Sequence, residues 1–367
     1  MASPTISEIL RSDLHKLHAP SSASITNIQQ LSSYNWIEAP SGKPTIAIPG
    51  CPSLWTSPIG SKRLPKDHGR VYIAQNAYRH SQSPLEPLFR ALYFSNPSYD
   101  IRQIDIVTDR NNIRKLLSYV KGGVRLEAFT FKVEMVEKTA IFCREETRTY
   151  EDIGPHDFRG YGHEFEKAYT KNEIEESTGH HRVISYRFGN LNIIVRHETD
   201  GIFESLSVSP SKSVTTMPAG SVLHIKNEGH LVPLESTLEI KTRVFHKPLN
   251  FNDIAPQLWV SQTPQLVRAY HNKGTFSEAR VENVATHVKK WEEDNQKDLV
   301  KMAALFEKVV SLVRESGGIA MVRYDVIRNS LVVQMCGDET KMLPEDLYSK
   351  WKDDKKSKDS GTEGTET

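Results

Sequence analysis

The sequence predicts an α+β fold in which mixed β-sheets are flanked by helices. Strand-like stretches are numerous and do not alternate regularly with helices, as they would in a parallel α/β fold. One long amphipathic helix is expected over residues 281–316, because its apolar residues recur at helical spacing. Two further strands follow this helix, and no repeat of any period is visible.

The composition is that of an ordinary soluble globular protein. The chain has 367 residues, a net charge of +1 and 38% hydrophobic residues. No apolar run approaches the roughly 18 residues of a membrane-spanning helix, and the N-terminus lacks the apolar core of a signal peptide. The three cysteines, Cys51, Cys143 and Cys336, are widely spaced, which fits a reducing cytosol or nucleus. With a net charge near zero, any nucleic-acid binding must come from a local basic patch.

Three segments are expected along the chain. Residues 1–30 are polar and Ser-rich and are expected to form a flexible N-terminal arm, with one short helical stretch. Residues 31–350 form a single folded domain, whose beginning, 33–58, is Pro-rich and reads as irregular apart from a strand at 45–50. Residues 351–367 form a tail without aliphatic side chains and are expected to be disordered.

The elements of the domain follow from local patterns. A helix is expected over 83–94, with Ser83 as its N-cap and Pro84 in its first turn. A strand entering a helix is expected over 103–120, with Asp109 or Asn111 near the start of the helix. Residues 182–201 read as two strands joined at a Gly-Asn turn, which is typical of a hairpin.

The remaining elements are shorter. A helix is expected to open at 162–170, and another helix-like stretch begins at residue 256. Periodicity and β-branched content indicate strands in six further places: 125–136, 138–150, 220–229, 236–245, 319–326 and 330–336. A strand, a turn at Asn272-Lys273-Gly274 and another strand are expected between the second helix and the long amphipathic helix.

The strand at 236–245 carries two charges on one face. Strand side chains alternate between faces, so Glu239 and Lys241 point the same way and Ile240 points the opposite way. Such a pair is often a solvated surface ion pair, which contributes little to stability. The pair alone therefore does not distinguish an exposed sheet face from a functional site.

A second pair, Glu198 and Asp200, closes the preceding apolar strand just before Gly201. If the two strands are neighbours, three carboxylates and one lysine converge. Neighbouring carboxylates repel by about 1 kcal/mol in water and roughly 4 kcal/mol at a lower effective dielectric, so such a cluster needs a compensating cation. Oxygen ligands favour Mg²⁺ or Mn²⁺, and Glu166 from the helix at 162–170 is a further candidate ligand. The pattern indicates metal-assisted hydrolysis of a phosphodiester.

These segments, taken in order, resemble the DXO family of decapping nucleases. The sequence shows "GHEFEKAYT", "IIVRHETDG" and "LEIKT", followed by "PQLWVSQTPQLVRAYHNKGTF". In that family a Gly-led helix ends in a metal-binding Glu and is followed by Glu-φ-Asp and Glu-φ-Lys strands, where φ is apolar. The resemblance covers roughly residues 30–340 and is to a divergent member of the fungal type. It implies a core similar to the PD-(D/E)XK nucleases, with the active-site cleft between sheets.

The resemblance also implies roles for single residues. Metal ligands would be the side chains that match the family pattern, together with one backbone carbonyl: Glu166, Glu198, Asp200, Glu239 and the carbonyl of Ile240. Glu198 would bind the second of two Mg²⁺ or Mn²⁺ ions or its water.

The same resemblance assigns roles to three further residues and argues against a role for a fourth. Lys241 would contact the attacking water or the phosphate, while Arg110 and Gln257 would face the substrate. Glu164 competes with Glu166 for the helix position, and the family pattern favours Glu166.

The chain departs from the family where the substrate should be read. Asp109 stands where the family has tryptophan, and Asn111 stands where it has glycine. Thr199 occupies the apolar position of Glu-φ-Asp, and Ala255 replaces a tryptophan ahead of Gln257. The family's N-terminal arginine motif is not visible. These changes leave the acidic set complete but leave open which substrate is bound and which end of it is read.

The resemblance implies a metal-dependent hydrolase of RNA 5′ ends that acts in mRNA quality control. Its substrates would be incompletely methylated caps, NAD caps or 5′-triphosphates, and some relatives degrade the RNA onward from its 5′ end. Two alternatives stay open: a non-catalytic protein that stabilises a nuclear 5′→3′ exonuclease, and a DNA-directed nuclease on the same core. We expect a monomer without a membrane partner, located in the nucleus, the cytoplasm or both.

Overall fold

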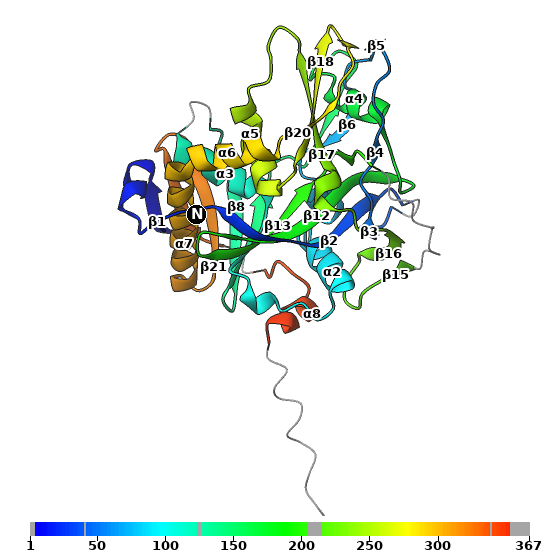
Figure 1. The fold of residues 1–367 in the computed structure, drawn as a ribbon. Helices are drawn as coiled ribbons and strands as arrows, with labels where there is room; N and C mark the ends of the chain where they lie inside the picture. Colours follow the sequence, from blue (N-terminus) through cyan, green and yellow to red (C-terminus); the bar gives the residue numbers. More distant parts are fainter. Residues whose placement is uncertain (1–3, 40–41, 123–125, 205–214, 338–339, 353–367) are drawn as a thin grey trace, which may run out of the picture.

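The computed structural model describes residues 4–39, 42–122, 126–204, 215–337 and 340–352, and Figure 1 shows its fold. Two β-sheets and a short two-stranded ribbon form the framework, and helices pack against the sheets. This is the α+β architecture that the sequence predicts. Across the described residues, every helix is too short or too polar to pass through a lipid bilayer.

The larger sheet runs through the middle of the molecule. In the described residues its strands follow the order β1 (Thr5–Leu10), β22 (Ser330–Met335), β21 (Ile319–Asp325), β8 (Thr130–Val136), β9 (Thr139–Glu145), β7 (Ile106–Asp109), β13 (Leu191–Glu198), β12 (Ser177–Phe188), β2 (Ile25–Ile37), β3 (Thr45–Gly50), β16 (His224–Gly229) and β15 (Thr215–Thr216). The expected hairpin is β12 and β13, which pair in antiparallel register. The parallel neighbour of β13 is β7, so the sheet is mixed.

The smaller sheet carries the strand with the Glu-x-Lys pair. Its order is β11 (Thr170–Lys171), β4 (Leu54–Trp55), β14 (Gly201–Ile202), β17 (Thr237–Val244), β18 (Gln265–Asn272), β19 (Thr275–Phe276) and β5 (Lys62–Arg63), and β20 (Val281–Asn283) pairs with β18. The separate ribbon consists of β6 (Gly69–Tyr72) and β10 (Tyr150–Ile153).

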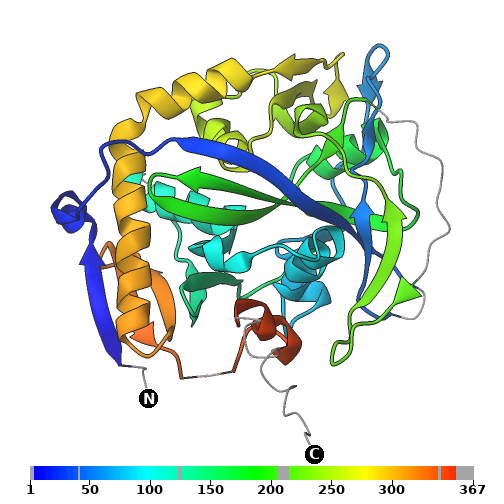
Figure 2. The ribbon, with the colours of Figure 1, turned by 60° about the horizontal axis from the view of Figure 1, so that its bottom comes forward.

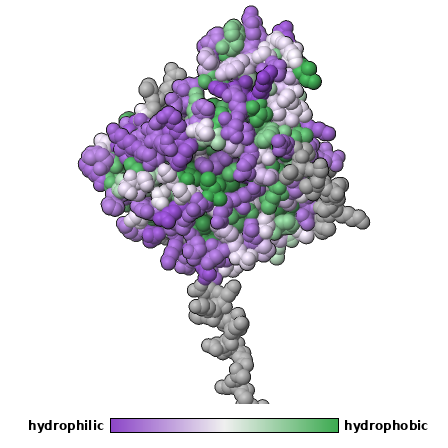
Figure 3. Space-filling model, in the orientation of Figure 1, coloured by the Kyte–Doolittle hydropathy of each residue, from purple (hydrophilic) through white to green (hydrophobic). Residues whose placement is uncertain are grey.

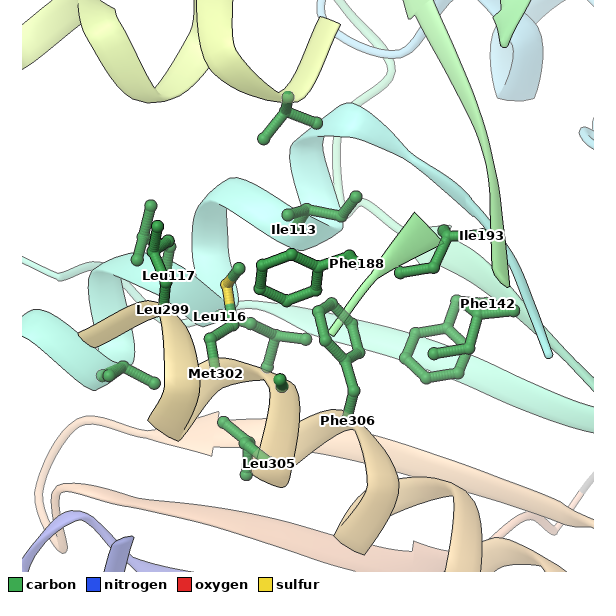
Figure 4. Close-up of a cluster of buried hydrophobic side chains, with 14 of the residues drawn as sticks. Ile113, Leu116, Leu117, Phe142, Phe188, Ile193, Leu299, Met302, Leu305 and Phe306 are labelled. Atoms are coloured by element: carbon green, nitrogen blue, oxygen red, sulfur yellow. The ribbon is translucent and has the colours of Figure 1, made fainter. Parts of the chain in front are cut away.

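The helices cover both faces of the larger sheet. They are α1 (Gln75–Arg79), α2 (Glu86–Ser95), α3 (Arg110–Lys121), α4 (Gly162–Tyr169), α5 (Phe251–Ser261), α6 (Ala285–Asp294), α7 (Gln296–Glu315) and α8 (Glu345–Tyr348). The main core joins α3 and α7 to one face, where Leu116, Phe142, Phe188 and Phe306 are fully or almost fully buried (Figure 4). A second core lies under α2 and α8. Helix α4 packs on the smaller sheet through Phe165.

The N-terminal segment differs from the flexible arm that we expected over residues 1–30. Strand β1 pairs along β22 and forms the edge of the larger sheet. Ile9 and Leu14 are 5% and 3% exposed because both side chains enter the main core. Burial of these side chains, together with the strand pairing, holds the segment in place. At the other end of the chain, Trp351 is buried, and residues 353–367 of the expected disordered tail lie outside the described residues.

The beginning of the segment expected to be irregular, residues 33–37, is instead the end of a long strand, β2. The sequence pattern did not predict this strand, because the polar residues Ser32, Ser33 and Asn35 interrupt its apolar residues. Each of them is buried with a backbone partner from a distant segment: the carbonyl of Ala91 at 2.8 Å, that of Pro49 at 2.8 Å and that of Cys51 at 2.9 Å, respectively. Buried polar groups are tolerated when such hydrogen bonds are made.

The long helix expected over 281–316 is instead strand β20 at its beginning, followed by two helices, α6 and α7, which meet at a sharp bend in Figure 2. Asn295 lies between them with φ −108° and ψ 13°, and its side chain donates to the carbonyl of Trp291 at 2.7 Å. Asparagine side chains compete with the helical hydrogen bonds in this way. The bend lets both helices keep their apolar faces toward the main core.

Ser83 does not cap α2 as the sequence suggested. Its hydroxyl donates to the carbonyl of Met342 at 2.7 Å and so anchors the C-terminal segment instead. Helix α2 begins at Glu86, with a proline, Pro87, in its first turn. Much of the face shown in Figure 3 is hydrophilic, and apolar residues gather near its middle.

Candidate active site

The candidate site lies where the chain crosses from the larger sheet into the smaller one. Strand β13 ends at Glu198, and β14 begins at Gly201, opposite Leu238 of β17. A side chain at position 201 would start 2.9 Å from the carbonyl oxygen of Ser53, so only glycine fits this close approach. Asp200 lies at the crossing, and its Oδ2 accepts the N–H of Ile240 at 2.7 Å. The strand that ends at Glu198 (β13) and the strand that carries Glu239 (β17) therefore belong to different sheets. They approach each other where the chain crosses from one sheet to the other.

Glu239 is the most buried carboxylate of the group. The residue is 2% exposed, and one of its oxygens contacts both the Lys241 ammonium and the Gln257 amide. Its other oxygen lies 3.3 Å from Nη1 of Arg110. Arg110 and Gln257, which the resemblance places at the substrate, thus both reach Glu239. Arg110 is at the start of α3 and Gln257 is on α5, so these two helices and β17 converge on this carboxylate.

Helix α4 brings a further carboxylate to the crossing. Its N-terminus is capped by Asp67 from a distant loop, whose two oxygens each accept a backbone N–H, from Gly162 and Glu164, at 3.0 Å. The Glu164 side chain pairs with Lys167 at 2.8 Å and does not face the cluster. Glu166 faces Asp200 and Lys241, whose charges both act on its pKa. Of the two candidates on this helix, the structure places Glu166 in the site.

The carboxylates influence one another strongly. Burial, and then the nearby charge of Asp200, raise the pKa of Glu166 well above its usual value. Burial and the charge of Glu239 raise the pKa of Asp200 to about 7. For Glu239 burial acts in the same direction, but the charges of Lys241 and Arg110 outweigh it and lower its pKa. The surroundings thus favour the ionised form of Glu239, whereas burial and neighbouring charge favour the protonated forms of Glu166 and Asp200.

Glu198 lies at the wall of an open pocket and is reached by solvent, although protein surrounds the recess. Burial is the main cause of its raised pKa, which the positive charge of Arg110 opposes. The pocket has a volume of about 110 Å³, and its lining includes Tyr72, Arg110, Arg144 and His181. The pocket therefore places Glu198 beside the guanidinium groups of Arg110, Arg144 and Arg196, an arrangement suited to an anionic substrate.

The structure explains the Asp109 departure from the family pattern. Both oxygens of Asp109 accept hydrogen bonds from the guanidinium of Arg196, at 2.7 and 3.0 Å. Parallel pairing of β7 with β13 places the two residues opposite each other. Arg196 also donates to the carbonyl of Pro84 at 2.7 Å. Asp109 thus ends β7 with a fixed ion pair, immediately before Arg110 turns toward Glu239.

The donor set fits a hard divalent cation in its chemistry. Glu166, Glu198, Asp200 and Glu239 supply oxygen ligands, and burial followed by nearby carboxylate charge raises the pKa values of Glu166 and Asp200, which a bound cation would oppose. In the described residues, however, no three His, Cys, Asp or Glu side chains are arranged as a preformed metal shell. Protein donors occupy both oxygens of Glu239, so these contacts must rearrange before Glu239 can bind a cation.

Several pocket residues escaped the sequence prediction. His181 lines the pocket because it pairs directly with Glu198 across β12 and β13. Arg144 arrives from the end of β9, and Tyr72 arrives from the β6/β10 ribbon. Of these residues, only His181 could have been found from the sequence. The hairpin turn sets the strand register, and this register places His181 opposite Glu198. Nothing local marked Arg144 or Tyr72.

Solved structures of Rai1 share this fold. Rai1 of S. pombe in complex with 3′-FADP has a TM-score of 0.57 and 13% identity, over 90% of this chain and 99% of that chain. Rai1 of Scheffersomyces stipitis in complex with (3′-NADP)+ and calcium has a TM-score of 0.58 and 12% identity, over 96% and 99%. Rai1 of Candida albicans in complex with pU5-Mn²⁺ has a TM-score of 0.54 and 12% identity, over 91% and 96%.

These identities are low, so the likeness concerns the fold, and in that respect it confirms the resemblance to the DXO family. A comparison with curated proteins gives no match. A family model described as a domain of unknown function (DUF8563) matches residues 9–351, which is nearly the whole described chain. The chain therefore belongs to the DUF8563 family and has the fold of the Rai1 proteins.

Proposed function

We propose that this chain is a metal-dependent hydrolase that cleaves a phosphodiester bond at the 5′ end of RNA. The observation that carries the proposal is the convergence of Glu166, Glu198, Asp200, Glu239 and Lys241 at the crossing between the two sheets. The Rai1 fold supports it, because one such structure contains pU5 with Mn²⁺ and others contain 3′-FADP or (3′-NADP)+. Without a cation, so many neighbouring carboxylates would repel a phosphate.

The side chains of the site have different proposed roles. Glu166, Asp200, Glu239 and the Ile240 carbonyl would hold one Mg²⁺ or Mn²⁺, and Glu198 would support a second. When bound, the ions would neutralise the phosphate and lower the pKa of a water ligand. Lys241, held against Glu239, would orient the attacking water or donate to a phosphate oxygen.

The pocket beside Glu198 would take the 5′-terminal group. Arg110 and Arg144 on its wall suit a di- or triphosphate bridge, because guanidinium groups match phosphate oxygens in geometry and charge. Incompletely methylated caps, NAD caps and 5′-triphosphates all carry such a group. We propose that cleavage occurs at the first phosphodiester and that stepwise 5′→3′ cleavage can follow.

The test is hydrolysis of capped, NAD-capped and triphosphorylated RNA with Mn²⁺ or with EDTA. We expect product only with metal, and loss of product in Glu239→Ala and Asp200→Ala. Glu164→Ala is the matched control, because this residue lies on the same helix as Glu166 but pairs outward with Lys167. Absence of metal-dependent product from every RNA contradicts the proposed reaction. Activity retained in both site variants contradicts the site.

One observation favours a second candidate function. Lys241, Gln257 and Arg110 satisfy Glu239 from within the protein, an arrangement that would also suit a non-catalytic relative that stabilises a nuclear 5′→3′ exonuclease. The same purified chain separates the two functions: such a protein would raise the stability of the exonuclease in a mixture and would show no hydrolysis alone.

Single-stranded DNA in the same assay tests DNA-directed cleavage. Localisation to nucleus or cytoplasm is proposed equally and is tested by imaging a tagged chain.

A further inference from the structure

The two-stranded ribbon of β6 and β10 presents an aromatic face next to the pocket. Tyr150 lies opposite Tyr72, and Asp152 lies opposite Arg70, so all four side chains share one face. Tyr78 of α1 packs on this face, with its ring centroid 5.1 Å from that of Tyr72 and 5.1 Å from that of Tyr150. We call Arg70, Tyr72, Tyr78 and Tyr150 the tyrosine platform.

Arg70 is held rigidly at the outer end of the platform. Its Nε and Nη2 donate to the two oxygens of Asp152 at 2.9 and 3.0 Å, and its Nη1 donates to the Tyr78 hydroxyl at 2.8 Å. The guanidinium lies over the Tyr150 ring, with Cζ 4.3 Å from the ring centroid. The Arg70 side chain is nevertheless 43% exposed. It therefore offers a fixed planar surface to solvent, with most of its hydrogen-bond donors already used.

The inner end of the platform is part of the pocket wall. Tyr72 lines the pocket together with Glu198 and Arg110. Its hydroxyl accepts a hydrogen bond from Arg79 at 3.1 Å, which fixes the ring at the pocket mouth. Tyr78 follows, and Tyr150, which is 38% exposed, lies beyond it. These rings, packed at tilted and edge-on angles, thus lead from the pocket beside Glu198 outward to the surface.

We propose that the tyrosine platform stacks a nucleobase of the ligand whose phosphates enter the pocket. This inference rests on the proposed function, because it assumes a ligand that contains nucleotides. Aromatic rings and guanidinium planes are the surfaces on which proteins stack unpaired bases. The hydrogen bonds of Arg70 to Asp152 and Tyr78 leave its face, rather than its donors, available, which favours a base over a phosphate.

The base has two possible sources, the RNA chain and the terminal group. A short 5′-phosphorylated RNA carrying 2-aminopurine represents the first, and etheno-NAD represents the second. Both are fluorescent base analogues, and stacking on an aromatic side chain changes their emission. Binding is measured on the full chain in Ca²⁺ without Mn²⁺, so that a cation compensates the carboxylates, as calcium accompanies (3′-NADP)+ in the Scheffersomyces stipitis Rai1 structure. Gel analysis checks that the RNA probe stays intact.

We expect Tyr150→Leu and Arg70→Met to weaken binding of at least one probe by about tenfold and to remove the emission change. Tyr150→Phe keeps the ring and should bind like the parent. Phe94→Leu is the matched control, because Phe94 is 40% exposed but lies on α2, away from the ribbon. Thermal unfolding of each variant checks that the ribbon remains folded. Loss with the RNA probe alone assigns the base to the RNA chain, and loss with etheno-NAD alone assigns it to the terminal group.

The outcomes separate this inference from the proposed function. Binding that depends on the platform, without any hydrolysis in Mn²⁺, supports the platform and contradicts the hydrolase. Hydrolysis in Mn²⁺, with equal binding by the parent, Tyr150→Leu and Arg70→Met, contradicts the platform alone. A parent chain that binds neither probe also contradicts the platform.

Discussion

Glu239 and Asp109 show how single carboxylates are paired with cationic side chains at this site. Glu239 receives Lys241 from its own strand, whereas its other partners, Arg110 and Gln257, come from two helices. Asp109 receives Arg196 from the neighbouring strand, and the Arg196 side chain is 2% exposed. For Glu239, burial alone would raise the pKa, but the nearby charges of Lys241 and Arg110 outweigh burial and lower it. The two ion pairs are linked in sequence, since Asp109 and Arg110 are adjacent.

The Asp109–Arg196 pair gives a prediction at this scale. Asp109→Ala should lower the free energy of unfolding by about 3–5 kcal/mol, because it leaves a buried guanidinium without its partner. Adding Arg196→Met should recover part of the loss, since the uncompensated charge is then removed. Urea denaturation of both variants measures this. The exposed pair of Asp100 with Arg102 provides the control, and Asp100→Ala should lower the free energy of unfolding much less than Asp109→Ala does. An equal loss in Asp109→Ala and Asp100→Ala would refute the prediction.

At the scale of elements, α4 owes its position to a cap supplied from elsewhere in the chain. The first turn of this short helix is held by Asp67, which lies 95 residues away from Gly162. The helix is eight residues long and would be marginal alone. Its burial through Phe165 and this cap set the direction in which Glu166 points.

Removal of the cap should therefore affect both stability and the candidate chemistry. We expect Asp67→Ala to lower the free energy of unfolding by about 1–2 kcal/mol. It should also lower the rate of metal-dependent hydrolysis, because Glu166 loses its fixed orientation. Asp67→Asn keeps one acceptor oxygen and should lie between the parent and Asp67→Ala in both measurements. If Asp67→Ala unfolds at the parent's denaturant midpoint, the cap does not hold the helix.

Local sequence patterns predicted some of these elements and missed others. The β12/β13 hairpin, β17 and α4 followed from local patterns, because their apolar faces and turn residues agree with their structure. Strand β2 did not, since Asn35 and its polar neighbours are satisfied only by segments that folding brings close. The approach of Glu198 to Glu239 was conditional on strand pairing and was instead produced by a crossing between sheets. Pairings of this kind depend on contacts remote in sequence, which periodicity does not encode.

At the scale of the whole molecule, Glu292 ties three parts of the main core together. This α6 residue is 2% exposed and accepts hydrogen bonds from the Ile25 N–H and the Trp259 indole, both at 2.8 Å. Lys289 lies 2.6 Å from its other oxygen. Burial alone would raise the pKa of Glu292, but these hydrogen bonds outweigh it and lower the pKa from its usual value of 4.5.

The lowered pKa predicts a pH dependence of stability. Below about pH 4.5 the unfolded chain protonates this carboxyl while the folded chain does not, so the unfolded state binds more protons. The contribution of Glu292 is present above this pH and is lost as the pH falls through the folded-state value. Glu292→Gln should be less stable than the parent at pH 7 and should lose less stability between pH 5 and pH 3, as measured by urea denaturation. Parallel losses in the two proteins would contradict this role.

The crossing from β13 to β14 makes the candidate site dependent on long-range assembly. Glu198 arrives with the larger sheet, Glu239 and Lys241 arrive with the smaller sheet, and Glu166 arrives with the helix that covers the smaller sheet. A nascent or partly unfolded chain that has formed only one sheet thus presents an incomplete set of ligands. Binding of a divalent ion at this site would therefore require both sheets to be in place. The proposed hydrolysis of RNA would then be limited to fully folded molecules.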